Sequence, residues 1–112
     1  DVYKRQVYET TATAPPEELH RFFLACREDG FQPARRRLRE LLDRFGLAGT
    51  DLVNQLHRGL GDVPFLTEGQ KLSVTQTMAE ADFRMVEGGG EALQLDAMTA
   101  RLCTLLSPEM KS

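Results

Sequence analysis

The side chains that most often bind metals or carry out catalysis are few in this sequence. His20 and His57 are the only histidines, and neither has a second ligand at the spacing of a metal-binding motif. Cys26 and Cys103 lie far apart and outside any CxxC pattern. Zinc sites normally use closely spaced pairs of such ligands, so we expect no metal site. Both histidines are expected to be structural or on the surface. The cysteines are expected to be free thiols, with a single disulfide as the alternative.

The feature closest to a nucleotide-binding loop is the run Gly88-Gly89-Gly90. A P-loop has its glycines after a strand and before a Lys-Ser or Lys-Thr pair, because backbone N–H groups and the lysine hold the phosphates. Here the glycines follow a predicted helix and lead to Glu91, so they predict a helix stop and a turn. We therefore expect no cofactor in this chain. Ser73, Thr75, Thr77 and Ser107 have no adjacent base in the sequence, and we expect no catalytic residues.

The strongest local concentration of charge is Arg35-Arg36-Arg37-Leu38-Arg39, on the polar side of a predicted helix. Three interpretations are open. The favoured one is a solvent-exposed face, partly neutralised by Glu40 and Asp43. The second is a salt-bridged contact with a neighbouring chain. The third is contact with DNA, because clustered arginines can hold a duplex backbone, although the acidic residues nearby argue against DNA binding by this chain alone.

A second group of charged residues lies on a predicted helix nearer the C-terminus. Glu80 and Arg84 are four residues apart, a spacing that stabilises an exposed helix by about 0.3–0.5 kcal/mol. An ion pair within the helix is the simplest interpretation, and contact with another subunit is the alternative. The candidate residues for a subunit interface are Arg36, Arg37, Glu80, Asp82, Arg84 and Gln94.

The elements that position these residues are predicted to be five helices. Apolar residues recur at helical spacing in five segments that glycines and prolines separate. No segment alternates between apolar and polar residues, so strands are not expected. The first two segments are joined by a short turn and should form a hairpin of antiparallel helices. The fold class is therefore all-α, a compact bundle of about five helices near residues 15–28, 34–45, 50–60, 67–87 and 92–106.

Two helix starts and one position in the bundle can be predicted. Thr50 is the expected N-cap of the third helix. Thr67 and Gln70 fit a capping box at the start of the fourth. The fourth helix is the longest, and its apolar residues from Leu72 to Val86 cover more than one face. This pattern predicts that the fourth helix lies at the centre of the bundle.

Length and composition are those of one globular domain. The chain has 112 residues, of which 41% are hydrophobic and 28% charged. The formal net charge of −3 is not that of an obvious nucleic-acid-binding chain. We expect no membrane-spanning segment and no signal peptide.

The first six residues need a separate interpretation. Asp1 to Gln6 are the translation of GAT GTG TAT AAG AGA CAG, which resembles a transposase-end adapter used to prepare sequencing libraries. We predict that residues 1–6 are a non-native tail and that part of the protein is missing before Val7. The alternative is an ordinary disordered terminus. Residues 7–106 are then the helical domain and residues 107–112 a C-terminal tail.

Several short motifs, taken in their order, resemble the C-terminal domain of archaeal-type replication factor C small subunits. Each motif alone is weakly specific, but together they cover nearly all of residues 7–106. The triple glycine departs from the family pattern and predicts a loose turn. In chain order the motifs are Val7-Tyr8 and Pro16-Glu17-Glu18-Leu19, then Ala34-Arg35-Arg36-Arg37-Leu38-Arg39-Glu40-Leu41-Leu42 with Gly46-Leu47-Ala48-Gly49, then Asp51-Leu52-Val53 with Gln55-Leu56-His57-Arg58, then Ala79-Glu80-Ala81-Asp82-Phe83-Arg84-Met85-Val86-Glu87-Gly88, then Gln94-Leu95-Asp96-Ala97.

The resemblance implies an oligomerisation domain, the collar of a pentameric clamp loader. In such complexes AAA+ ATPase domains, which have no counterpart here, use ATP and Mg²⁺ to open a sliding clamp and load it at primer–template junctions. The implied partners are other replication factor C subunits in a hetero-pentamer, with the clamp and DNA reached through the whole complex and no membrane involved. The implied location is cytoplasmic, or nuclear in a eukaryote. The alternative is a free-standing nucleic-acid-binding or protein-interaction module that uses the Arg35–Arg39 face.

Overall fold

The computed structural model describes residues 13–108, and the predicted all-α bundle is confirmed there. These residues form five α-helices, one short 3₁₀ turn and no strand. The predicted tail at residues 1–6 and most of the predicted C-terminal tail lie outside the described residues. The elements are α2 (Pro16–Glu28), α3 (Phe31–Phe45), α4 (Gly49–Gly59), η1 (Leu60–Asp62), α5 (Glu68–Val86) and α6 (Glu91–Leu106).

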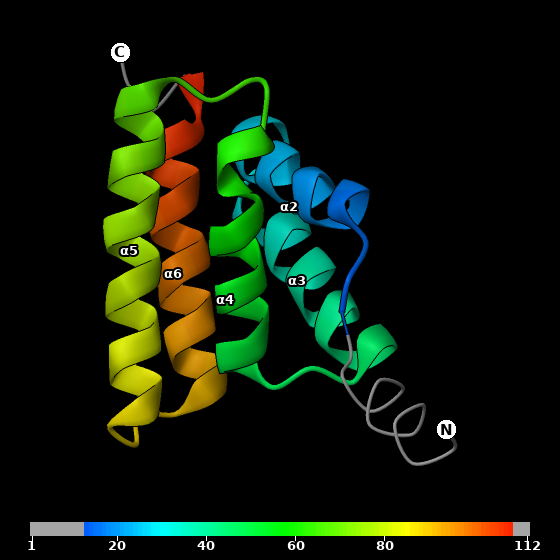
Figure 1. Cartoon of the computed structure of the whole chain (residues 1–112), viewed down its shortest axis with the longest axis vertical. Helices are drawn as coiled ribbons and strands as arrows, with labels where there is room; N and C mark the ends of the chain where they lie inside the picture. Colours follow the sequence, from blue (N-terminus) through cyan, green and yellow to red (C-terminus); the bar gives the residue numbers. More distant parts are fainter. Residues whose placement is uncertain (1–12, 109–112) are drawn as a thin grey trace, which may run out of the picture.

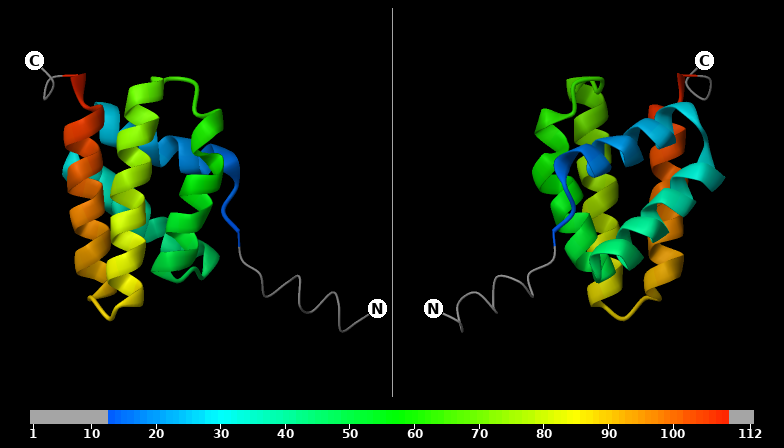
Figure 2. Two further views of the ribbon diagram at one scale, coloured as in Figure 1. Left: turned by 60° about the vertical axis from the view of Figure 1, so that its left-hand side comes forward. Right: turned by 90° about the vertical axis from the view of Figure 1, so that its right-hand side faces the viewer.

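The helices are arranged as a hairpin lying across a group of three. α4, α5 and α6 run alongside one another, whereas α2 and α3 cross them at an inclined angle (Figure 1). The right-hand view of Figure 2 looks onto α2 and α3, which turn back on each other after Asp29–Gly30. α6 contacts α2, α3, α4 and α5, so it is the helix that holds the two parts of the bundle together.

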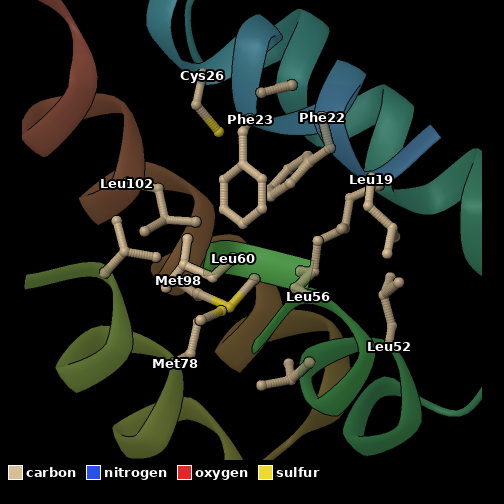
Figure 3. Close-up of a cluster of buried hydrophobic side chains, with 14 of the residues drawn as sticks. Leu19, Phe22, Phe23, Cys26, Leu52, Leu56, Leu60, Met78, Met98 and Leu102 are labelled. Carbon is tan, nitrogen blue, oxygen red and sulfur yellow. The ribbon is translucent and has the colours of Figure 1, made fainter. Parts of the chain in front are cut away.

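The core is filled by side chains from every α-helix. Two aromatic rings of α2, Phe22 and Phe23, are fully buried, with ring centroids 5.7 Å apart and planes tilted by 53°. Such a tilted arrangement is a favourable geometry for aromatic pairs. Figure 3 shows these rings beside aliphatic and sulfur-containing side chains of α4, α5 and α6, among them Leu56, Met78, Met98 and Leu102.

The prediction that α5 lies at the centre of the bundle is wrong. One face of α5 packs against α4 and α6 and buries Val74, Met78 and Ala81. The opposite face leaves Leu72 62%, Phe83 63% and Val86 68% exposed. α5 therefore lies at an edge of the bundle (Figure 1), and its second set of apolar residues points away from the core of this chain.

One predicted helix start is confirmed and the other is wrong. Thr67 and Gln70 form the capping box, with Gln70 N–H donating to Thr67 Oγ1 at 3.1 Å and Thr67 N–H donating to Gln70 Oε1 at 2.9 Å. The N-cap of α4 is Ala48 rather than Thr50, and no side chain at that position caps the helix. The Gly49 N–H instead donates to the carboxylate of Glu91 at the start of α6. This tertiary contact replaces a local cap and ties α4 to α6.

The triple glycine forms a hydrogen-bonded turn, so the prediction of a loose turn is wrong. Gly88 N–H donates to Met85 O at 3.1 Å, and Gly89 N–H donates to Arg84 O at 2.8 Å. This is the Schellman pattern of a helix C-terminus. Gly88 has a φ of +102°, and a Cβ at Gly89 would lie 2.8 Å from the Arg84 carbonyl oxygen. Two of the three glycines are therefore required by the geometry.

Candidate subunit interface

The arginine run on α3 is bound largely to other helices of the same chain. Arg35 Nε donates to Asp96 Oδ2 at 3.1 Å. An amino group of Arg39 donates to both carboxylate oxygens of Asp96, at 3.3 and 3.1 Å. Asp96 belongs to α6, so these two arginines connect α3 to α6 across 57 and 61 residues of sequence.

A second carboxylate, Glu18 of α2, is surrounded by three arginines. The nitrogen–oxygen distances are 3.5 Å for Arg21, 3.9 Å for Arg37 and 3.6 Å for Arg44. The Glu18 side chain is only 12% exposed, whereas those of Arg21 and Arg44 are about 60% exposed. Glu18 is therefore a largely buried carboxylate shared by arginines of both helices of the hairpin.

Arg36 alone in the run is exposed without an ion pair within residues 13–108. The favoured sequence interpretation is a solvated face, partly neutralised by Glu40 and Asp43. Arg36 and Arg39 are exposed as it predicts, but the ion pairs of the run are made with carboxylates of other helices. The carboxylates that compensate the run are Glu18 and Asp96, brought to α3 by helix packing. No local pattern in the sequence indicated Glu18 or Asp96, because these carboxylates belong to α2 and α6 and the arginine run belongs to α3.

Three of the six candidate residues line one groove between α5 and α6. Glu80 Oε2 accepts from an amino group of Arg84 at 3.0 Å, so the predicted ion pair within the helix is confirmed. Gln94 lies opposite on α6. The groove has a volume of about 440 Å³, and its lining includes Ser73, Glu80, Arg84, Gln94 and Arg101.

The other three candidates lie elsewhere. Asp82 faces the α4 side of α5, in a shallow groove with Asn54 and His57. Arg36 and Arg37 lie on α3, at the edge of the bundle away from α5 (Figure 1). The six residues therefore do not form one site. They are divided between two faces, one on α5 and α6 and one on α3.

The most distinctive surface feature is a row of exposed apolar side chains on α5, and none of the six candidate residues belongs to it. Leu72, Ala79, Phe83 and Val86 are exposed and lie on the face of α5 opposite to its buried residues. We call these four residues the α5 stripe. Their spacing of 7, 4 and 3 residues is that of a helix face that packs against another helix. The sequence signal for this surface was the presence of apolar residues on more than one face of the helix.

Groups with metal-binding or redox chemistry are sparse in the described part of the chain. Residues 13–108 hold no cluster of three or more His, Cys, Asp or Glu side chains that could bind a metal ion. Cys26 and Cys103 are free thiols, Cys26 being buried and Cys103 partly exposed. None of the helices in this region combines the length and hydropathy that crossing a membrane requires.

Fold and surfaces together define a small helical-bundle domain with an apolar stripe on its exterior. The sequence model of the family described as "Replication factor C C-terminal domain" matches residues 14–101. The chain therefore belongs to the replication factor C family and corresponds to its C-terminal domain.

Curated relatives lead to the same family. The chain is 34% identical over 100 residues to a "Replication factor C small subunit" of Methanocella arvoryzae, with 89% of this chain covered. It is 37% identical over 99 residues to that of Archaeoglobus fulgidus, with 88% covered, and 37% identical over 101 residues to that of Natronomonas pharaonis, with 90% covered. The chain spans 31% of the length of each of these three relatives.

Proposed function

We propose that this chain is the collar domain of a clamp-loader small subunit. In this role it holds subunits together and so supports ATP-dependent loading of the sliding clamp in DNA replication. The proposed partners are other replication factor C subunits in a hetero-pentamer, with the clamp and primer–template DNA engaged by the whole complex. ATP and Mg²⁺ would bind to an ATPase domain of the parent protein, and this domain would need no cofactor and carry no catalytic residue.

The observation that carries the proposal is the α5 stripe. Leu72, Phe83 and Val86 are more than half exposed although they belong to a well-packed helix. Fully burying a side chain of this kind gains about 1.5–3 kcal/mol. A contact that covered the stripe would therefore gain several kcal/mol, a useful contribution to a stable subunit interface.

The nucleic-acid-binding alternative is less well supported by the contacts of α3. Arg35 and Arg39 share Asp96, and Arg37 contacts Glu18. Phosphate binding would have to compete with these ion pairs, which leaves Arg36 as the arginine of the run most available to a duplex.

The proposal is tested by measuring assembly. We expect sedimentation velocity to show concentration-dependent association of the chain, alone or mixed with the collar domain of a replication factor C large subunit. Replacing Phe83 and Val86 with serine should weaken that association at least tenfold, because about 3 kcal/mol or more of apolar burial is lost.

The matched control retains apolar surface, with Phe83→Leu and Val86→Ile. It should associate within about threefold of the unchanged chain, since its stripe remains apolar. Circular dichroism should show equal helicity for all variants, because both positions are exposed. A chain that stays monomeric in every mixture would contradict the collar proposal.

A further inference from the structure

The two cysteines of the chain belong to helices that pack against each other. Cys26 lies on α2 and Cys103 on α6, and these two helices are in contact. Figure 2 shows the C-terminal end of α2 beside the C-terminal half of α6 in both views. Cys26 is part of the core, and Cys103 is packed against that core. The fold therefore brings two thiols together from distant parts of the sequence.

The thiols of Cys26 and Cys103 lie within hydrogen-bonding reach of each other. Hydrogen bonding to Cys103 is the largest cause of the raised pKa of the Cys26 thiol, and hydrogen bonding to Cys26 is the largest cause of the lowered pKa of Cys103. Such mutual effects require the two sulfur atoms to be neighbours. Their proximity is a property of the folded chain, because three complete helices, α3, α4 and α5, separate the two positions in the sequence.

The surroundings of the two thiols give them different roles. Cys103 is partly exposed, so a small molecule in solution can reach its sulfur. Cys26 is fully buried, and its sulfur points into the apolar cluster that also holds Phe23 and Leu102 (Figure 3). Attack on an external reagent therefore begins at Cys103, with Cys26 beside it as the second thiol. An accessible thiol of lowered pKa next to a resolving thiol is typical of redox-sensitive cysteines.

We propose that Cys26 and Cys103 form a disulfide when the folded chain meets a low-molecular-weight disulfide such as oxidised glutathione. The Cys103 thiolate attacks one sulfur of the reagent, which forms a mixed disulfide and releases one thiolate. The Cys26 thiol then loses its proton, and its thiolate attacks the Cys103 sulfur and displaces the second thiolate. The protons that the two cysteines lose end on the two released thiolates. The cysteines are oxidised by two electrons, and the reagent is reduced to two thiols.

Modification of Cys103 also makes the second step easier. The hydrogen bond to Cys103 is the largest cause that keeps the Cys26 thiol protonated. An uncharged sulfur in a mixed disulfide accepts a hydrogen bond more weakly than a thiolate does, so the Cys26 thiol then ionises more readily. Burial still opposes that ionisation, so the second step should be the slower one.

The disulfide would join the two parts of the bundle covalently. α2 belongs to the hairpin that lies across the other helices, and α6 contacts α2, α3, α4 and α5. The closed loop would contain α3, α4 and α5. A long closed loop strongly restricts the unfolded chain, so oxidation should stabilise the fold. The proposal goes beyond the collar function and needs no second subunit, so the failure of either one leaves the other standing.

Oxidation of the folded chain in glutathione redox buffers tests the proposal. Intact mass spectrometry should show a monomer that has lost two hydrogen atoms, and peptide mapping should place the crosslink between Cys26 and Cys103. The equilibrium constant for closing the disulfide should be at least about tenfold larger in native buffer than in urea, because the fold holds the two sulfurs together. The urea midpoint of unfolding should rise on oxidation and return to its original value with a reductant.

Two variants show whether the pairing depends on position. Cys26→Ala should stop at the mixed disulfide of Cys103. The matched control carries Cys103→Ser and Thr104→Cys, which moves the thiol by one residue to an exposed position of α6. It should also stop at a mixed disulfide, and circular dichroism should show that both variants are folded. The proposal is overturned if the unchanged chain gives only mixed disulfides or dimers between chains. It is also overturned if the Thr104→Cys control closes equally well, or if closing is no more favourable in native buffer than in urea.

Discussion

The two cysteines show how a single contact between helices changes the chemistry of a side chain. Cys26 of α2 and Cys103 of α6 are 77 residues apart in sequence, yet each thiol lies close enough to shift the pKa of the other by hydrogen bonding. This hydrogen bond, together with burial, raises the pKa of the Cys26 thiol. The same hydrogen bond lowers the pKa of the Cys103 thiol, and partial burial opposes that shift. The two thiols should therefore differ in reactivity.

We expect iodoacetamide to modify Cys103 of the folded chain well before Cys26. The thiolate is the reactive form, so a lowered pKa lets Cys103 react at a lower pH than an ordinary thiol, whereas Cys26 stays protonated and buried. Peptide mass spectrometry over neutral and mildly alkaline pH measures both rates. Cys26→Ala removes the hydrogen bond and should move the reactivity of Cys103 to higher pH. In urea both thiols should react alike. Equal rates in the folded chain would contradict the assigned pKa directions.

At the scale of one element, α5 ends in a turn whose three glycines have different roles. Gly88 has a positive φ, and Gly89 leaves no room for a Cβ beside the Arg84 carbonyl oxygen. Gly90 has a φ of −59°, and nothing lies within 4 Å of a Cβ built there. A position of this kind accepts alanine without strain, so the three glycines serve as one another's controls.

We expect Gly88→Ala to lower the free energy of unfolding by about 1 kcal/mol, because alanine is strained at positive φ. Gly89→Ala should cost at least about as much, since a backbone carbonyl must move. Gly90→Ala should be neutral or stabilising by up to about 1 kcal/mol, because it only restricts the unfolded chain. Urea unfolding followed by circular dichroism measures all three. Equal effects at the three positions would show that the turn is not the Schellman motif described above.

At the scale of the whole molecule, two carboxylates hold the α2–α3 hairpin to itself and to α6. Asp96 makes hydrogen bonds of 3.1 to 3.3 Å with Arg35 and Arg39. Glu18 meets its three arginines at longer distances of 3.5 to 3.9 Å. Short charge-assisted hydrogen bonds are stronger than looser ion pairs between partly exposed groups. Asp96 should therefore contribute more to stability than Glu18, although it meets fewer arginines.

We expect Asp96→Asn to lower the free energy of unfolding by about 1–2 kcal/mol and Glu18→Gln by up to about 1 kcal/mol. The control Asp43→Asn, at an exposed position of α3, should change it by less than about 0.5 kcal/mol. Urea titrations at low and high salt measure these differences. The effect of Glu18→Gln should shrink more in high salt, because its arginines are the more exposed. A larger loss for Glu18→Gln than for Asp96→Asn would contradict this ranking.

Features that depend on neighbouring residues could be predicted from the sequence. Apolar residues at helical spacing predicted a helix near residues 34–45, and Ala34, Leu38 and Leu41, which recur at that spacing, are buried on one face of α3. The Thr67–Gln70 capping box and the Glu80–Arg84 pair are both present. In each case the interacting groups lie within one or two helical turns, so the sequence spacing alone fixes their distance. The same locality explains why the all-α fold class was predictable.

Features that depend on how helices pack were decided only by the tertiary structure. The Glu91 carboxylate caps α4 from 42 positions away in the sequence. A local pattern could suggest only a nearby residue such as Thr50 as the cap. The partners of the arginine run are on α2 and α6 rather than on α3 itself. The sequence by itself determined that α5 has two apolar faces, but not which one the chain buries. That choice depends on the surfaces that α4 and α6 present after folding, and it leaves the α5 stripe on the outside.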